Sequence, residues 1–63
     1  MDLQDRLQKL GQVIRSLTND DVRYALAERI RSFGYVDFRD LFQSRPQERH
    51  VRELEMMLGM QAA

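Results

Sequence analysis

The side chains with catalytic potential are few and lie apart from one another. His50 is the only histidine, and the chain contains no cysteine. Ser16, Ser32 and Ser44 have no histidine or second base beside them in the sequence, so a serine nucleophile would lack an activating group. The three glycines stand alone and form no phosphate-binding loop. We therefore expect no enzymatic activity, no cofactor and no small-molecule substrate.

The adjacent carboxylates Asp20 and Asp21 are the nearest approach to a metal site. They follow Thr18 and Asn19, either of which can cap the start of a helix. Thr18 with Asp21 approximates a capping box, and the helix dipole favours negative charge in the first turn. A helix start accounts for both acids, so no metal site is predicted.

Binding is the other chemistry open to this chain, and residues 44–58, SRPQERHVRELEMML, are its best candidate. Arg45, Arg49 and Arg52 are spaced four and three residues apart, so on a single helix they form one outward stripe. The residues predicted to contact a partner macromolecule, protein or DNA, are Arg45, Gln47, Arg49, His50, Arg52, Glu53 and Met56.

Acidic residues accompany this stripe. Glu48 stands four residues before Arg52, and Arg49 stands four residues before Glu53. Such pairs stabilise an exposed helix surface by themselves. The stripe is therefore typical of two things, a partner-binding face or a salt-bridged, solvated surface.

Composition limits the class of partner. Ten basic and ten acidic side chains give a net charge of zero, whereas domains that bind nucleic acid nonspecifically usually carry a basic excess. DNA binding would have to depend on a local patch. No apolar run approaches the roughly 20 residues of a membrane span, and the amino terminus lacks a signal-peptide core. We expect a soluble, cytoplasmic protein that does not bind membranes.

The chain has 63 residues, which predicts one domain, 1–63, with a small core. Its first helix, 2–17, carries five apolar residues at spacings of four, three, four and three, within an arc of about 80°. Such a narrow seam is typical of a bundle helix or of a coiled coil. Because the core is small, we favour a homodimer that pairs two copies of this helix over a bundle within one chain. The predicted interface is Leu3, Leu7, Leu10, Ile14 and Leu17.

Other residues of this helix carry weaker signals. Asp2 with Arg6, and Asp5 with Lys9, are acid-first pairs four residues apart. Gly11 costs the helix about 1 kcal/mol relative to alanine. It either marks a close contact with another helix or is simply tolerated.

Two further helices are predicted from capping residues. The segment 20–33 has helical periodicity and is followed by Gly34, which suits the left-handed residue after a helix. A short helix, 38–43, can be capped by Asp37.

The last helix is predicted over 45–58. Ser44 and Gln47 match the capping-box pattern, Pro46 is tolerated in a first turn, and Gly59 ends the helix. The fold class is therefore all-α, a small bundle of about four helices, in which 1–17 is the oligomerisation helix and 20–58 a tri-helical unit. The predicted helices are 2–17, 20–33, 38–43 and 45–58.

Two groups of apolar side chains fit either a core or an interface. Aromatic residues crowd into the middle of the chain, where most are needed for the core and one or two can centre an interface. Methionines near the carboxyl end give an adaptable surface or ordinary packing. These residues are Phe33, Tyr35, Phe38 and Phe42, and Met56, Met57 and Met60.

The run RIRSFGYVDFRDLFQSRPQERHVRELEMML resembles the tri-helical core of helix-turn-helix and winged-helix domains. In that resemblance Leu41 takes the buried position of the second helix, and Val51 and Leu54 those of the third. It departs from the family at Arg45, where a glycine is usual, and no β-hairpin follows the third helix. The resemblance implies that Gln47, Arg49, His50 and Glu53 lie near base edges, and that Arg45 and Arg52 lie near phosphates.

Two functions remain open from the sequence. The favoured one is a small non-enzymatic regulator that self-associates through its first helix and binds a partner, more readily a protein than DNA. The alternative is a dimeric helix-turn-helix regulator that binds DNA in successive major grooves.

Overall fold

The computed structural model describes residues 2–60, and within them the chain forms four helices and no strand. The all-α prediction is confirmed. Residue 1 and residues 61–63 of the predicted domain lie outside the described residues. No helix between residues 2 and 60 has the length and apolar character needed to cross a membrane. The helices are α1 (Leu3–Ser16), α2 (Asp20–Ser32), α3 (Phe38–Gln43) and α4 (Glu48–Met57).

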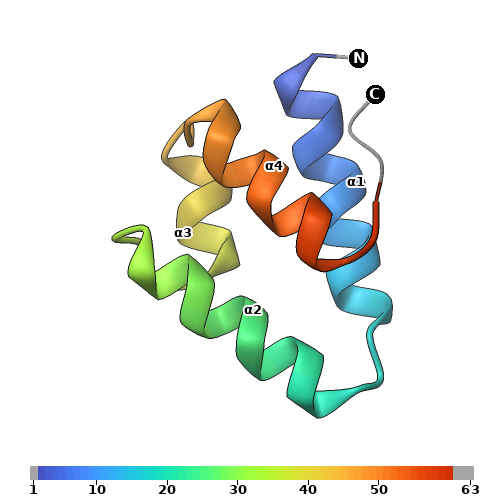
Figure 1. Cartoon of the computed structure of the whole chain (residues 1–63). Coiled ribbons are helices and arrows are strands. Elements are labelled where there is room, and N and C mark those ends of the chain that lie inside the picture. Colours follow the sequence, from blue (N-terminus) through green and yellow to red (C-terminus); the bar gives the residue numbers. More distant parts are fainter. Residues whose placement is uncertain (1, 61–63) are drawn as a thin grey trace.

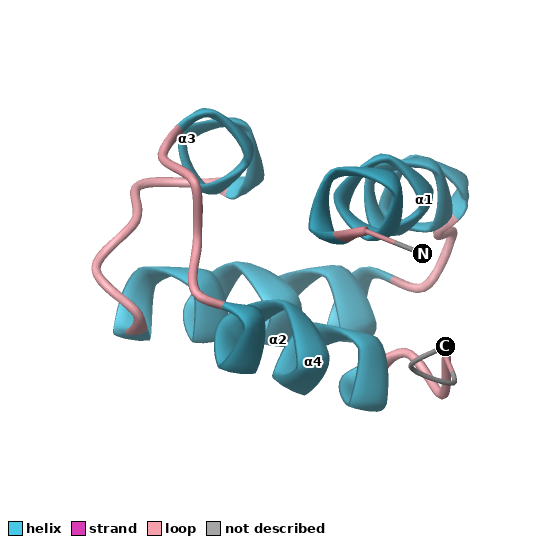
Figure 2. Ribbon diagram, turned by 90° about the horizontal axis from the view of Figure 1, so that it is seen from above, coloured by secondary structure: helices cyan, strands magenta, loops and turns pink. Residues whose placement is uncertain are grey.

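The helices form two layers. In Figure 1, α2 and α4 pass in front of α1 and α3. Seen from above, α1 and α3 lie side by side in one layer, and α2 and α4 make up the other (Figure 2). The core therefore lies between the two layers, and each layer presents its other side to solvent.

All four helices contribute to this core. The apolar spacing of each helix places its leucine, isoleucine or valine side chains on the inward side. The first helix supplies two of these side chains, so part of its predicted dimer seam is buried in the core of its own chain. The buried apolar residues of the core are Leu7, Leu10, Leu26, Ile30, Leu41, Val51 and Leu54.

Side-chain oxygens cap three of the four helix starts. The Asp2 carboxylate accepts a hydrogen bond from the Asp5 N–H at 2.9 Å, and that of Asp37 accepts one from the Asp40 N–H at 2.8 Å. Of the two possible caps for α2, Asn19 is the one used. Its side chain accepts from the backbone N–H groups of residues 21 and 22. These bonds satisfy donors that a helix start otherwise leaves unpaired.

Glycines end α2 and α4 as predicted. Gly34 has φ of +102° and Gly59 has φ of +72°, a backbone conformation that glycine adopts without a steric penalty. The predicted ends of both helices are therefore confirmed to within one residue.

The start of α4 differs from the prediction. The helix begins at Glu48 instead of residue 45. Ser44 is not its cap, because it ends α3, its N–H bonding to the Asp40 and Leu41 carbonyl oxygens. Gln47 stands at the cap position without a side-chain hydrogen bond. Arg45 has φ of +51°, and a residue before proline is disfavoured in the helical region, so the chain turns there and the helix begins beyond buried Pro46.

We expect the substitution Arg45→Gly to raise the free energy of unfolding by about 0.5 kcal/mol. A non-glycine residue in the left-handed region costs about 1–2 kcal/mol, and the greater freedom of glycine in the unfolded chain offsets part of the gain. Thermal denaturation followed by circular dichroism measures the difference. Arg45→Ala is the control, because it removes the same side chain and keeps the strained backbone. Equal stability of the two variants would contradict the explanation.

Gly11 marks a close contact between helices. A Cβ added there would lie 3.1 Å from Cε2 of the Phe38 ring, closer than ordinary van der Waals contact. Gly11 is buried, and the absence of its side chain allows α3 to place an aromatic ring directly against α1. Of the two explanations that the sequence allowed, close packing is therefore the one supported.

Candidate interaction site

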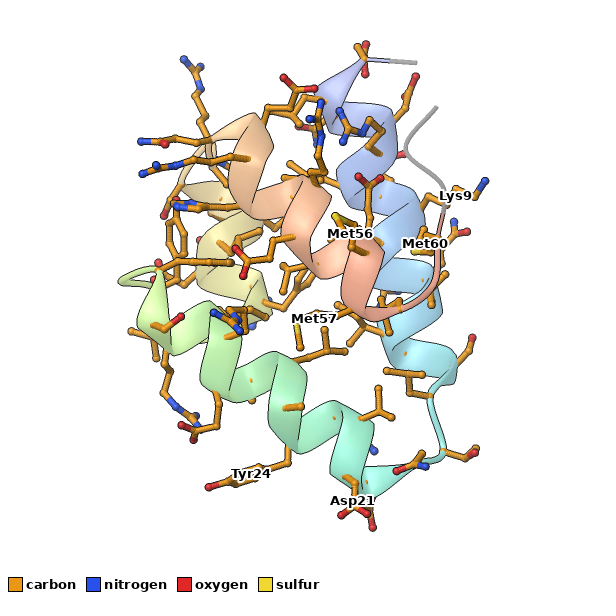
Figure 3. The ribbon with its side chains drawn as sticks, viewed as in Figure 1. Lys9, Asp21, Tyr24, Met56, Met57 and Met60 are labelled. Carbon is orange, nitrogen blue, oxygen red and sulfur yellow. The ribbon has the colours of Figure 1, made fainter. Side chains whose placement is uncertain are left out.

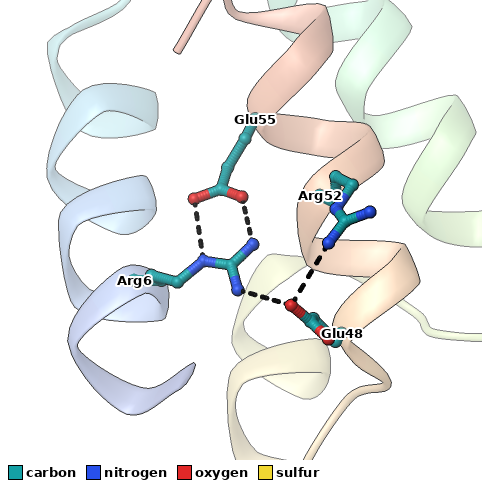
Figure 4. Close-up of polar contacts among 4 residues, drawn as sticks. All are labelled: Arg6, Glu48, Arg52 and Glu55. Carbon is teal, nitrogen blue, oxygen red and sulfur yellow. Dashed lines mark hydrogen bonds and ion pairs between the residues drawn. The ribbon is translucent and has the colours of Figure 1, made fainter. Parts of the chain in front are cut away.

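The helix α4 is held in place from two directions. Val51 and Leu54 are fully buried in the core. On the side toward α1, the guanidinium of Arg6 makes a two-pronged ion pair with the carboxylate of Glu55 (Figure 4). Nη2 of Arg6 donates to Oε1 at 2.6 Å, and Nε donates to Oε2 at 3.3 Å. The side chains are only 8% and 3% exposed, so this is a buried salt bridge between α1 and α4.

The ion pair extends into a network of four residues. Nη1 of Arg6 donates to Oε1 of Glu48 at 3.1 Å, and the same oxygen accepts from Nη2 of Arg52 at 3.5 Å. The hydrogen bond with Glu55 is the largest cause of a raised pKa for Arg6, against which burial acts in the opposite direction. A cation whose pKa is raised on folding adds stability at every pH below its unfolded pKa. The guanidinium of Arg6 therefore stays charged throughout the neutral pH range, so the Arg6–Glu55 pair keeps its positive partner there.

The sequence prediction missed this network. It paired Arg6 with Asp2, whereas Asp2 caps α1 and the guanidinium turns to α4 instead. It assigned no partner to Glu55. One signal was available, because Glu55 follows Val51 by four residues and therefore shares its buried face. A charge on a buried face requires a partner.

The outward side of α4 has a mixed surface. Arg49 and Arg52 are exposed there, and so is Met56, which is 70% exposed. Figure 3 shows Met56 on α4 and Met57 where α4 meets α2. Arg52 shares Glu48 with Arg6, which confirms the predicted Glu48–Arg52 pair. The side of α4 away from the core thus combines guanidinium groups with exposed methionine.

The predicted arginine stripe is shorter than expected. Arg49 and Arg52 lie on α4, but Arg45 lies in the loop before it, because the helix begins at Glu48. Arg45 and Gln47 are both exposed in that loop. The prediction of one helix carrying all three arginines is therefore wrong, while the exposure of all three side chains is observed.

Two of the predicted contact residues are engaged within the chain. His50 stacks on the Phe33 ring, with centroids 4.1 Å apart, and meets the Tyr35 ring edge-on at 6.0 Å. Its Nδ1 is buried without a hydrogen-bond partner. Glu53 pairs with Arg29 of α2 at 3.2 Å, and not with Arg49 as its spacing indicated. Both residues join α4 to α2, which leaves the outward surface to Arg49, Arg52 and Met56.

The five residues of the predicted dimer seam all contact the core of their own chain. Leu7 and Leu10 are 2% and 0% exposed, while Leu3, Ile14 and Leu17 are partly buried against the same core. This burial supports the intramolecular bundle, the other structure that the spacing allowed. Self-association through this seam stays a prediction.

The acids predicted to begin a helix do so. Asp20 and Asp21 occupy the first turn of α2, where the Asp21 N–H donates to Asn19. Across the described part of the chain, no three histidine, aspartate or glutamate side chains gather in a way that would hold a metal ion.

Comparisons with protein-family models, with curated proteins and with solved structures find no match for this chain.

Proposed function

We propose that this protein is a non-enzymatic regulatory module that binds a partner protein through the outward side of α4. The binding surface consists of Arg49, Arg52 and Met56, with Met57 at its edge. One observation carries the proposal: a large apolar side chain, Met56, is 70% exposed on the same helix as the exposed Arg49 and Arg52, and that helix is firmly anchored.

The residue types support protein contact. Arginine and methionine are enriched at protein interfaces relative to the rest of the surface, and methionine adapts its shape to a partner groove. The buried Arg6–Glu55 pair and the stacked His50 fix α4 on both flanks. A partner therefore meets a preformed helix and bears little ordering cost.

Affinity capture from the native cell tests this proposal. The double variant Arg49→Glu/Met56→Ala is expected to lose the captured protein by about tenfold or more, as for central interface residues. Arg23→Glu/Tyr24→Ala is the matched control. It makes the same charge reversal and also truncates a large exposed side chain, but on α2, where both residues are exposed and Tyr24 extends away from the body (Figure 3). Equal capture by both variants would place the binding surface elsewhere.

A second candidate function is DNA binding by a helix-turn-helix regulator. It is favoured by one local feature: α3 and α4 are joined by a tight turn at Arg45, whose φ is +51°. In the resemblance that position is usually a glycine, the residue for which positive φ is easiest. In addition, Arg39, Arg45 and Arg49 form no ion pair with a carboxylate between residues 2 and 60.

Nuclease treatment separates the two functions. A captured protein that remains after digestion of nucleic acid supports the α4 proposal. Loss on digestion, together with affinity for duplex DNA that falls steeply with salt, would support the helix-turn-helix regulator instead.

A further inference from the structure

A second site lies in the layer away from α4. A cleft of about 350 Å³ opens between α1 and α3, and residues of these two helices alone line it. Phe38 and Phe42 supply its apolar surface, with ring centroids 6.2 Å apart and planes inclined by 56°. Arg15, Arg39 and Gln43 complete the lining. Its size is within the range of about 300–1,000 Å³ typical of ligand sites.

The cleft is bordered by positive charge. Neither Arg15 nor Arg39 lies within ion-pair distance of a carboxylate in the described chain. The acids closest to Arg39 in the sequence are occupied elsewhere. Asp37 accepts from the Asp40 N–H, and Asp40 accepts from the Val36 N–H at 2.9 Å. Two guanidinium groups are therefore left to bind an anion, which they do most strongly through paired hydrogen bonds.

The close packing of α1 against α3 positions these groups. The site of a Cβ on Gly11 lies 3.1 Å from the Phe38 ring and 3.8 Å from Nη2 of Arg15. The Phe38 ring and the Arg15 guanidinium therefore both lie next to Gly11, at the wall of the cleft. The charged and apolar parts of the site are adjacent, so a ligand has to offer both within one short segment.

We propose that this cleft binds an acidic peptide segment that carries an aromatic or leucine side chain. Carboxylates of the segment pair with Arg15 and Arg39, and its apolar side chain packs in the cleft against the rings of Phe38 and Phe42. This is a second interaction surface, in the layer opposite α4 (Figure 2), so the proposal goes beyond the partner binding assigned to α4. With both surfaces occupied, the protein bridges two partners.

Two observations favour a peptide over a nucleic acid strand. The chain has zero net charge, so it lacks the basic excess that supplies most nucleic-acid affinity. The two rings are inclined to one another by 56°, so they do not offer the parallel platforms on which single-strand binders stack successive bases.

The test is a titration of the full chain with a blocked peptide, Asp-Asp-Phe-Asp-Asp, followed by NMR and calorimetry. Resonances of Gly11, Phe38 and Arg39 are expected to shift, with Arg49 unaffected. Peptides with asparagine in place of aspartate, or alanine in place of phenylalanine, are each expected to bind about tenfold more weakly, as expected for loss of a charge-assisted hydrogen bond or a buried ring.

Protein variants complete the experiment. Arg15→Glu/Arg39→Glu should abolish binding, while Lys9→Glu/Arg23→Glu, which changes the net charge equally at exposed positions, should leave it intact. Absence of binding by the native chain, equal loss in both variants, or tighter binding of a short oligothymidylate would overturn the proposal. Because Arg49 and Met56 are unchanged throughout, failure here leaves the α4 proposal standing, and the reverse also holds.

Discussion

Replacing Glu55 with alanine is expected to lower the free energy of unfolding by about 3 kcal/mol, the lower end of the loss seen when one partner of a buried ion pair is removed. The guanidinium of Arg6 would stay buried, at 8% exposure, with only Glu48 to pair with. A chain of 63 residues is stable by roughly 3–9 kcal/mol, so this loss is a large share. Urea denaturation followed by circular dichroism measures it.

Two controls separate charge from packing in this experiment. Glu48→Ala removes the exposed acid of the network, whose side chain is 60% exposed, and should cost no more than about 1 kcal/mol. The double variant Arg6→Met/Glu55→Leu removes both buried charges and should stay near the stability of the native chain. A Glu55→Ala variant as stable as the native chain would show that the carboxylate contributes little to folding.

Local sequence patterns predicted the helices well because short-range physics determines them. The bounds of α3 were predicted as observed, and Asp37 caps it. Gly34 and Gly59 end their helices with positive φ. In each case the determining interaction lies within a few residues along the chain, between a capping side chain and a nearby N–H, or between a Cβ and its own backbone.

The start of α4 was not predictable in the same way. The pattern of Ser44 and Gln47 fits a capping box, but Arg45 adopts a left-handed conformation that arginine does not favour. Pro46 is buried after it. The residue before a proline disfavours the helical region, which was a local signal against a start at residue 45. Neither propensity nor spacing, however, predicts the left-handed conformation of Arg45.

The candidate site was predicted in part for a related reason. Helical spacing placed Arg49, Arg52 and Met56 outward, and all three are exposed. Spacing alone did not identify which carboxylates would be engaged elsewhere. The partners of the Arg6–Glu55 pair are 49 residues apart in sequence, so no local pattern relates them.

The substitution Leu10→Ala is expected to have the other large effect, a loss of about 2–5 kcal/mol in the free energy of unfolding. Leu10 is 0% exposed, so truncation leaves a cavity as well as removing apolar contact. Leu17→Ala at the partly buried end of the same seam should cost less. Since the total stability is small, the unfolding of Leu10→Ala should be followed at low temperature as well as at 25 °C.

The same variant bears on the quaternary structure, because the seam has two possible uses. If its leucines serve only the core of one chain, the use that the burial of Leu7 and Leu10 supports, the midpoint of unfolding is independent of protein concentration. A homodimer through this seam would instead make the midpoint rise with protein concentration. Leu10→Ala would then reduce the fraction of dimer, and sedimentation would give a lower average mass. The half-exposed seam residues Leu3, Ile14 and Leu17 then decide the matter: their substitution by glutamate should leave a monomer unchanged in mass, but dissociate a dimer.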